Sequence, residues 1–541
     1  MSRQSSYDFT HGLSSNGEFK IKDEKCSFTR RSKIVCYVNT YIDLLHSSSH
    51  CSLIIQQNGH KSESSPGGWS PLLILAGATC CLGSALPTGY NIGVINNPAD
   101  LMKTFCNESI QARYNVELSK GALNVVWSTV VSIFLIGGVT GSLSAGWLAD
   151  KLGRRGALAI GNALAILAAI LFLCVKAINS VEVLMAGRLI VGLSAGLATS
   201  LVPMYMTETA PLKLRGAVGV LCQLGITGGV LVGQILSLSY TLGTKELWHV
   251  MLAAFSPLSL ISLGLLYVLP ESPKYLYVIK GREGDAIKEL SRLRNLGRSI
   301  LDNEIANLDQ EAIAAKRTST WTMARVFKDP TLRLPLILVC AMQAGQQLSG
   351  INAIFYYSNT IYTEAGLGVT ASEYATLGTG VINVTMALIA VPVMSLFGRR
   401  TLFLLSCYLA AGFLIVSCIS IIFIVTAAMP WLCLIATLGY VLVYGLGLGP
   451  IPYFIGSELF DVGPRPAAMA LGSVSNWGGN FIVGMTFPVV EHAIGAYSFL
   501  IFAGCTLLLY ILYEIYLPET RGKSTMEIAA TVTRGFNSRP N

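Results

Sequence analysis

The chain has 541 residues, of which 52% are hydrophobic and 13% are charged, with a mean hydropathy of +0.57 and a formal net charge of +8. Soluble globular proteins carry about 25% charged residues, so this chain has too few ions to cover a body that water surrounds. The composition excludes a cytosolic enzyme and indicates an outer surface that faces lipid.

The N-terminal segment 1–68 is polar and serine-rich, and it contains no apolar stretch of the kind found in a secretory signal. We expect it to be a disordered cytosolic tail. Four of the six histidines lie in this tail, which leaves only His249 and His492 for the rest of the chain. No metal site or other cofactor is therefore expected.

Twelve apolar stretches follow, each with about the 20 residues that a helix needs to cross a bilayer. Their glycines and prolines are typical of packed membrane helices, whereas a β-barrel would show shorter, alternating segments. The sequence predicts an all-α membrane protein with twelve transmembrane helices. The predicted spans are 71–95, 122–148, 157–176, 183–206, 217–240, 250–269, 334–357, 377–397, 401–428, 430–455, 467–490 and 496–516.

Basic residues are concentrated in the loops that follow even-numbered spans. They are Lys151, Arg154, Arg155, Lys213, Arg215, Arg399, Arg400, Arg465, Arg521 and Lys523. The positive-inside bias places these loops and both termini in the cytosol. The sequence Asn107-Glu108-Ser109 then lies in the first external loop, where it predicts glycosylation of Asn107.

A polar insert, 270–330, separates spans six and seven and is predicted to form short amphipathic cytosolic helices. It divides the chain into six-helix bundles at 69–269 and 331–518, followed by a cytosolic tail at 519–541. The two bundles repeat one another in sequence at offsets of 245 to 250 residues. The repeated elements are Gly153-Arg154-Arg155 with Gly398-Arg399-Arg400, Glu208 and Arg215 with Glu458 and Arg465, and Pro270-Glu271-Ser272 with Pro518-Glu519-Thr520. Parallel six-helix repeats describe the major facilitator fold of transporters.

The polar side chains within the spans are mainly uncharged amides. They are Gln223, Gln234, Gln343, Gln346, Gln347, Asn352, Asn383 and Asn480. An ionic solute would need a counter-charge at its site, whereas amides both donate and accept hydrogen bonds and so suit a neutral polyhydroxy molecule. Tyr356, Tyr357, Tyr453 and Trp477 are candidates to face the apolar side of a sugar ring.

A lone glutamine in a span more often joins two helices than binds a solute, so we expect Gln234 and Gln343 to do the former. The polar run 346–352 instead indicates a substrate site. The repeated charges Glu208, Arg215, Glu458 and Arg465 favour an ion-pair latch on the cytosolic side over isolated interface charges, and Gly137, Gly141 and Gly146 are expected at close helix contacts. No Ser/His/Asp or Cys/His set is apparent, so we do not expect an enzyme.

Several motifs in chain order resemble those of the facilitative glucose transporters, the uniporter branch of the sugar porters. The motifs are Gly146 to Arg155, Gly187-Arg188, Pro270 to Pro273, Gln346 to Asn352 with the following Ala-Ile-Phe-Tyr-Tyr, Gly463 to Ala468, and Pro518 to Gly522. The resemblance covers about residues 69–525. It implies uniport of a hexose across the plasma membrane by a multi-pass protein that needs no cofactor, nucleic acid or oligomer. The triplet Gln347-Leu348-Ser349 is similar to that of members that prefer D-glucose.

The resemblance also implies roles for individual residues. The hexose site would use Gln223, Gln346, Gln347, Asn352, Asn383, Tyr453 and Asn480. An inner-side charge network that holds the outward-open state would use Asp150, Arg154, Arg155, Glu208, Arg215, Glu271, Arg399, Arg400, Glu458 and Arg465.

Three positions depart from the family pattern: Gly445 replaces a glutamate, Tyr453 a tryptophan, and Ser395 an acidic residue. The first two leave the choice of hexose open, and the third removes one inner-side ion pair. Asn91 stands where proton-coupled relatives carry aspartate, which favours uniport. A proton–sugar symporter and a non-transporting sugar sensor on the same scaffold remain the alternatives.

Overall fold

The computed structural model describes residues 68–211, 214–317, 323–423, 428–460 and 464–521, together with 528, 531, 532 and 535. Every regular element in these ranges is a helix, which confirms the predicted all-α class. The predicted N-terminal tail and most of the C-terminal tail lie outside the described residues. The side chains of Arg215 and Ser395 also lie outside them.

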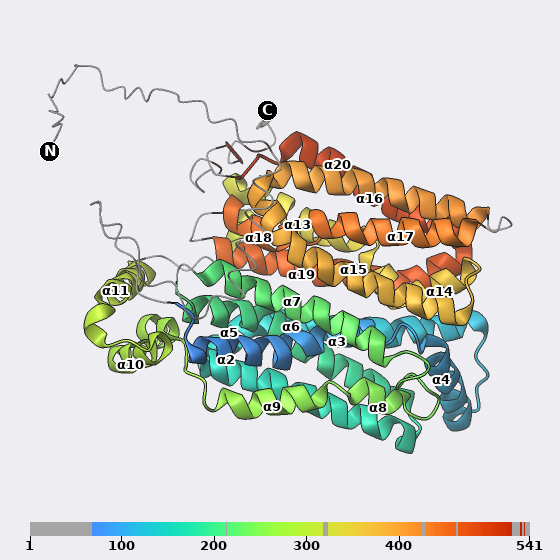
Figure 1. Cartoon of the computed structure of the whole chain (residues 1–541), viewed down its shortest axis with the longest axis horizontal. Helices are drawn as coiled ribbons and strands as arrows, with labels where there is room; N and C mark the ends of the chain where they lie inside the picture. The colour runs from blue at the N-terminus through green and yellow to red at the C-terminus, as the bar shows by residue number, and fades with distance from the viewer. Residues whose placement is uncertain are drawn as a thin grey trace, which may run out of the picture. The chain divides into compact units, whose positions relative to one another are not determined.

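The first half of the bundle begins with a single span made of three consecutive helical pieces (Figure 1). These are α2 (Pro71–Cys80), the π-helix η1 (Cys81–Ala85) and α3 (Leu86–Gly93). The other helices of this half are α4 (Ala99–Tyr114), α5 (Lys120–Ile178), α6 (Val181–Thr209), α7 (Arg215–Leu236), α8 (Trp248–Ala253) and α9 (Ser256–Leu266).

The predicted helical insert is present between the halves. It consists of η3 (Tyr275–Ile279), α10 (Glu283–Arg294), η4 (Arg298–Ile300), α11 (Asp302–Arg317) and α12 (Met323–Lys328). The second half contains η5 (Pro330–Leu332), α13 (Arg333–Leu348), α14 (Ile351–Glu364), α15 (Val369–Leu396), α16 (Arg399–Ile422), α17 (Met429–Leu446), α18 (Ile451–Leu459), α19 (Arg465–Ile494), η6 (Gly495–Tyr497) and α20 (Ser498–Tyr516).

These helices account for twelve membrane crossings. Within the described residues, nine stretches are long and apolar enough to cross a membrane. Two of them contain two crossings each, because α5 turns at Gly153 and because η6 separates α19 from α20. The shorter apolar helix 221–236 supplies the remaining crossing. Large apolar side chains such as Leu508 (68% exposed) and Ile435 (63%) point outward, as lipid-facing residues do.

The turn inside α5 depends on a glycine. Gly153 has a φ of 86° and a ψ of 167°, a conformation that other residues rarely adopt. A Cβ atom at this position would also overlap the Glu271 carboxylate. Gly153 therefore reverses the chain between the second and third spans, with a carboxylate packed directly on its backbone.

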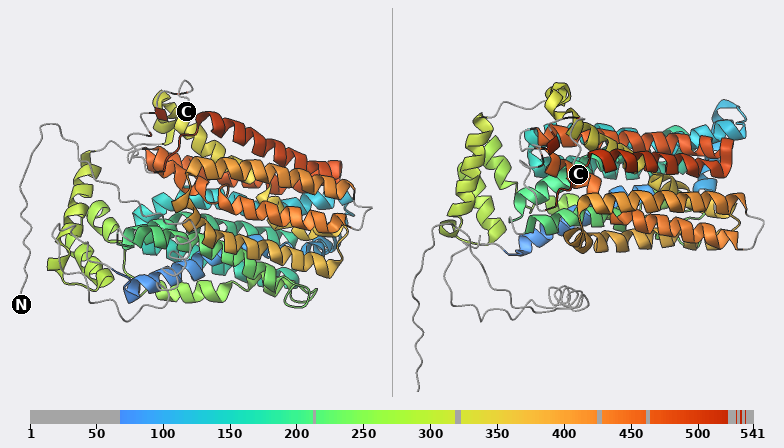
Figure 2. Two further views of the ribbon diagram at one scale, coloured as in Figure 1. Left: turned by 45° about the horizontal axis from the view of Figure 1, so that its top comes forward. Right: turned by 90° about the horizontal axis from the view of Figure 1, so that it is seen from above.

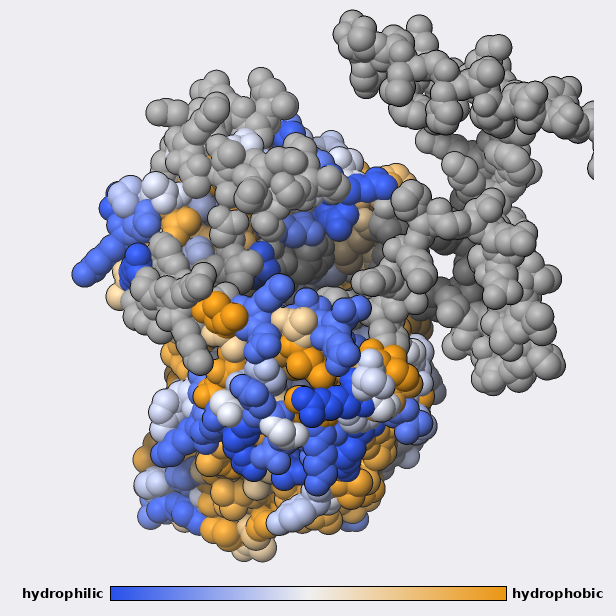
Figure 3. Space-filling view, turned by 90° about the vertical axis from the view of Figure 1, so that its left-hand side faces the viewer, coloured by the Kyte–Doolittle hydropathy of each residue, from blue (hydrophilic) through white to orange (hydrophobic). Residues whose placement is uncertain are grey.

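The two halves lie side by side, with blue-to-green helices on one side and yellow-to-red helices on the other (Figures 1 and 2). They meet where α5 packs against α19 and where α7 packs against α15. Helices α10 and α11 mark one end of the bundle, which we call the insert end, and α4 marks the opposite end, which we call the α4 end (Figure 1). Hydrophilic residues gather on the insert end, and hydrophobic residues cover much of the flank (Figure 3).

Helix α4 was not predicted from the sequence, because its stretch is too polar to be a span and was read as a loop. Its apolar side, Met102 and Cys106, is fully buried against the bundle. Asn107 is on the same helix. Ser109, the third residue of the glycosylation sequence, donates a hydrogen bond to the Asn179 carbonyl at 2.9 Å.

Candidate functional site

A cavity lies between the two halves, with a volume of about 100 Å³ that water-sized molecules can occupy. That is room for several water molecules. The first half contributes Thr88, Ile92, Thr199, Gln223, Ile226, Thr227 and Val230, and the second contributes Gln347, Ile351, Asn352, Phe355, Asn383, Tyr444, Tyr453, Asn476, Trp477 and Asn480. None of these lining residues is charged.

The cavity brings together six of the seven predicted substrate-binding residues. They are Gln223, Gln347, Asn352, Asn383, Tyr453 and Asn480. They come from five different helices, α7, α13, α14, α15 and α19, and from the short helix α18. Amides spaced more than 250 residues apart in the sequence therefore share one uncharged site.

A break in the seventh span positions two of these amides. Gly350 has a φ of 91° and separates α13 from α14. The amide of Asn352, just after the break, donates to the Oε1 atom of Gln347, just before it. Because of the break, both side chains face the cavity. In one continuous helix they would point in widely different directions.

Gln346, the seventh predicted residue, does not line the cavity. Its Nε2 atom donates to the carbonyls of Leu448 at 3.0 Å and Gly449 at 2.6 Å. These carbonyls lie in the gap between α17 and α18, where Pro452 has no N–H to bond the carbonyl four residues earlier. Gln346 is 1% exposed in this state and supports the broken tenth span, so its contact with substrate stays a prediction.

Asn476 is a lining residue that the sequence analysis missed. Its Nδ2 atom donates to Oε1 of Gln343 at 2.8 Å and to Oε1 of Gln346 at 2.7 Å. A signal was available, because Asn476 precedes Asn480 by four residues and so lies on the same helical face. Gln343 also donates to the Pro452 carbonyl at 3.0 Å, so it joins helices as predicted.

The amides differ in how much hydrogen-bonding capacity remains free. Gln223 and Asn383 make no side-chain hydrogen bond to another residue in the described part of the chain. Asn480 accepts from the Tyr356 hydroxyl at 3.4 Å through its oxygen, which leaves its two N–H groups. Donors and acceptors from both halves are thus available to a polyhydroxy ligand.

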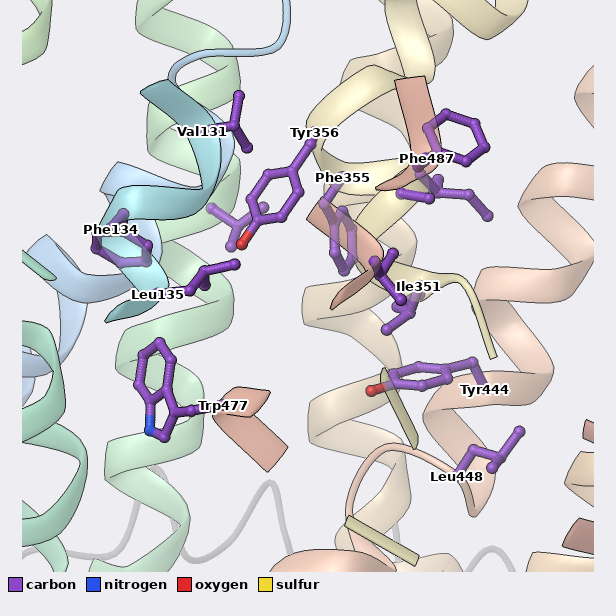
Figure 4. Packing of buried hydrophobic residues seen from close by; sticks show 14 of the residues in the cluster. Val131, Phe134, Leu135, Ile351, Phe355, Tyr356, Tyr444, Leu448, Trp477 and Phe487 are labelled. Atoms are coloured by element: carbon purple, nitrogen blue, oxygen red, sulfur yellow. The ribbon is translucent and has the colours of Figure 1, made fainter. Parts of the chain in front are cut away.

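Aromatic side chains close the apolar parts of the cavity (Figure 4). The Trp477 ring lies 6.1 Å from the Phe134 ring of α5, edge to face. The ring can occupy this position because Gly138 has no side chain, and a Cβ atom at Gly138 would clash with it. Of the four predicted aromatic residues, Trp477 and Tyr453 line the cavity. Tyr356 and Tyr357 are buried beside it, and Tyr356 reaches from α14 toward Val131 and Leu135 of α5.

Several residues of the predicted charge network form ion pairs at the insert end, in a similar pattern in the two halves. In the first half, Arg154 pairs with Glu208 at 2.8 Å and with Asp150 at 3.2 Å. Glu271 accepts from the backbone N–H groups of Arg154 at 2.9 Å and Arg155 at 3.2 Å. Burial raises the pKa of the Glu271 carboxyl, although these N–H groups act in the opposite direction.

The second half repeats this arrangement less tightly. Glu519 accepts from the backbone N–H of Arg399 at 2.8 Å, and the Arg399 side chain lies 3.5 Å from Glu458. Arg400 lies 3.5 Å from Glu514. Arg465 donates to the Phe460 carbonyl at 3.1 and 3.0 Å. The ion pairs described at this end each link residues of the same half.

Hydrogen bonds join the two halves at the α4 end. They run from Asn96 to the Phe355 carbonyl (2.9 Å) and Ser358 (2.6 Å), from Asn359 to Asn96 (3.1 Å), from Gln234 to Thr379 (3.3 Å), and from Ser239 to Glu373 (2.9 Å). The Gln234 contact confirms the predicted helix-joining role. The structure is therefore of a state in which the α4 end is closed.

Comparisons with known proteins agree with this geometry. A family model described as "Sugar (and other) transporter" matches residues 77–531. The human "Solute carrier family 2, facilitated glucose transporter member 4" is 41% identical over 467 residues, which cover 85% of this chain and 91% of the relative. The horse "facilitated glucose transporter member 5" is 39% identical over 486 residues, covering 88% and 95%.

Solved structures of the E. coli xylose transporter XylE share the fold. Its "partially occluded inward open conformation" has a TM-score of 0.69 at 23% identity and covers 84% of this chain and 100% of that one. The "MFS (major facilitator superfamily) proton:xylose symporter XylE bound to 6-bromo-6-deoxy-D-glucose" has a TM-score of 0.67 at 24% identity, covering 85% and 98%. These similarities confirm the predicted major facilitator fold.

Proposed function

The chain belongs to the sugar (and other) transporter family, and from this premise we propose that it is a facilitative hexose carrier that moves D-glucose down its gradient by alternating access. The observation that carries the proposal is the uncharged cavity between the halves, lined by amides with free hydrogen-bonding capacity. The names of the relatives, facilitated glucose transporters of several kinds, point to the same substrate class. The protein acts as a carrier and not as an enzyme.

The chemistry of the cavity suits a neutral hexose. Each sugar hydroxyl both donates and accepts a hydrogen bond, and so does each carboxamide. Trp477 and Tyr453 offer apolar ring faces for the carbon skeleton. Tyr453 lines the cavity, so part of its ring is within reach of a ligand there. A carrier must release its sugar, so we expect weak binding. A millimolar dissociation constant, for example, corresponds to a binding free energy of only about −4 kcal/mol.

Two buried residues near the first span favour uniport over proton symport. Asn91 is fully buried and cannot take up a proton near neutral pH. Arg188, also fully buried, donates to the backbone carbonyl of Asn91 at 2.8 Å and lies 4.7 Å above the Phe134 ring. Within the described residues, its hydrogen-bond acceptors are carbonyl groups. The pair therefore holds a constant charge instead of cycling a proton.

We further propose that the insert end is cytosolic and the α4 end external, with the chain in the plasma membrane. The basic loops lie at the insert end, as the positive-inside bias requires. Asn107 lies on α4, at the opposite end, where a glycan would be attached (Figure 1). In this orientation the structure represents an outward-closed state, and opening the external side requires the hydrogen bonds at the α4 end to break.

Counterflow in proteoliposomes tests the proposal. Purified protein should equilibrate radiolabelled D-glucose but not L-glucose, at a rate that a protonophore leaves unchanged. Collapse of uptake with the protonophore would instead identify a proton symporter. Failure to move glucose, fructose and galactose would leave the sensor alternative and reject the carrier. Parallel assays with fructose and galactose define the hexose preference that Gly445 and Tyr453 leave open.

A further inference from the structure

Glu373 is a buried carboxylate at the junction between the halves. It lies near the start of α15 and is 5% exposed. Its hydrogen-bond donors are both supplied by Ser239 of the other half, the hydroxyl at 2.9 Å and the backbone N–H at 3.5 Å. Within the described residues, no cation pairs with it. A burial of this kind is costly unless the hydrogen bonds to the charge are kept.

The contact joins the two halves at the α4 end. Ser239 is in the loop after α7, and Glu373 is on α15, so the bond crosses from one half to the other. The rings of Tyr240 and Tyr374 lie 6.4 Å apart across the same junction. Separation of α7 from α15 would break both contacts and expose the carboxylate to water.

We propose that Ser239 and Glu373 form a latch that closes the external end of the carrier. The latch stabilises the outward-closed state because the Ser239 hydroxyl replaces water on a charged group. Without that hydroxyl, closing the external end would bury a carboxylate with only a long bond to a backbone N–H. In the open state the carboxylate is hydrated whether or not the hydroxyl is present. Removal of the hydroxyl therefore penalises the closed state alone, and more strongly while residue 373 carries a charge.

The inference rests on the alternating access of the proposed function, but it can be tested without sugar. Val230 lines the cavity on α7, so a Val230→Cys reporter is reached by an external, membrane-impermeant maleimide only when the external end opens. The labelling rate of the reporter in intact cells measures the outward-open fraction. The same protein without Val230→Cys provides the background.

Ser239→Ala should raise the labelling rate about tenfold, the effect of losing one hydrogen bond to a charged group. In a Glu373→Gln background the same substitution should raise the rate by only about threefold, because a hydrogen bond to a charged group is about twice as strong as one between neutral groups. Thr241→Val is the matched control. The Thr241 hydroxyl bonds only carbonyls of its own loop and the end of α7, so the rate should not change.

Two results would overturn the latch. One is an unchanged rate in Ser239→Ala, and the other is an equal rise in both backgrounds, since either means that the hydroxyl does not act through the carboxylate. The amount of each variant at the cell surface is measured to correct the rates. If the protein shows the predicted labelling pattern but moves no hexose, the latch is supported and the hexose assignment is rejected. The two proposals therefore fail separately.

Discussion

Gln346 and Gln347 are adjacent in the sequence but have different surroundings, and this difference makes a sharp prediction. Gln347 lines the cavity, whereas Gln346 is bonded to the backbone between α17 and α18. Replacement of each by methionine keeps the length of the side chain and removes the amide. We expect Gln347→Met to weaken sugar binding in a stable protein, and Gln346→Met to destabilise the protein.

The magnitudes follow from the hydrogen bonds. Gln346→Met removes the donor to the carbonyls of Leu448 and Gly449 and the acceptor for Asn476. An unsatisfied buried polar group costs about 1–3 kcal/mol, so the loss of stability should be at least about 2 kcal/mol. Gln347→Met removes up to two hydrogen bonds to sugar, about 1–3 kcal/mol together, which corresponds to about a 5- to 150-fold weaker affinity.

Two measurements on the purified variants separate the effects. Thermal unfolding in detergent reports stability, and equilibrium binding of radiolabelled glucose reports affinity. Gln346→Met should unfold at a clearly lower temperature. Gln347→Met should lower the unfolding temperature less, because water in the cavity can replace the bond that Asn352 donates to Gln347. The reasoning is refuted if Gln346→Met unfolds normally and loses glucose binding, because Gln346 would then contact the sugar, as its sequence motif suggested.

Three further substitutions test other parts of the structure. Asn91→Asp places a titratable carboxyl on the buried residue whose backbone carbonyl binds the arginine of α6, so glucose uptake should become dependent on pH between 5 and 8; an unchanged pH profile would contradict the explanation of uniport. Gly153→Ala should destabilise the protein by about 1–3 kcal/mol, the cost of a strained backbone, whereas Gly146→Ala, with nothing within 4 Å of the new methyl group, should not. Asn107→Gln should abolish the mass shift that an endoglycosidase produces and Asn383→Gln should not, since the proposed topology places only the former outside the membrane.

The hydropathy of the sequence predicted all twelve crossings, because an apolar stretch that crosses the membrane must satisfy its backbone hydrogen bonds by forming helix. It predicted helix contacts less well. Gly137 lies against the backbone of α6 as expected, but nothing lies within 4 Å of a Cβ atom at Gly146, which is exposed. Gly146 follows Gly137 by nine residues, which places the two on opposite faces of a helix with 3.6 residues per turn. The spacing therefore supports a contact with α6 for Gly137 and Gly141, but not for Gly146. Helix α4 was missed because an amphipathic surface helix lacks the apolar length of a span.

The site was predicted in composition more accurately than in detail. Mid-membrane amides are costly without partners, which is why six of the seven predicted residues line the cavity. The role of Gln346 was missed because it depends on a carbonyl more than 100 residues later that Pro452 leaves without a donor. The Ser239–Glu373 contact was missed for the same reason, since 134 residues separate its members. Local patterns identify polar groups that need partners, but only the folded chain shows which partner each one has.

The two halves repeat at the insert end but differ around the cavity, and under the proposed function this difference predicts how binding is coupled to movement. Glu271 and Glu519 cap equivalent turns, yet the fourth span (α6) is continuous while its repeat, the tenth, is broken between α17 and α18. Gln346 ties that break to the seventh span, next to Gln347, which faces the cavity. A sugar that pulls on Gln347 therefore acts one peptide unit away from the hydrogen bonds that hold the broken span. The second half can respond to the ligand by bending at its breaks, whereas the first half meets the same ligand with an unbroken α6 and α7.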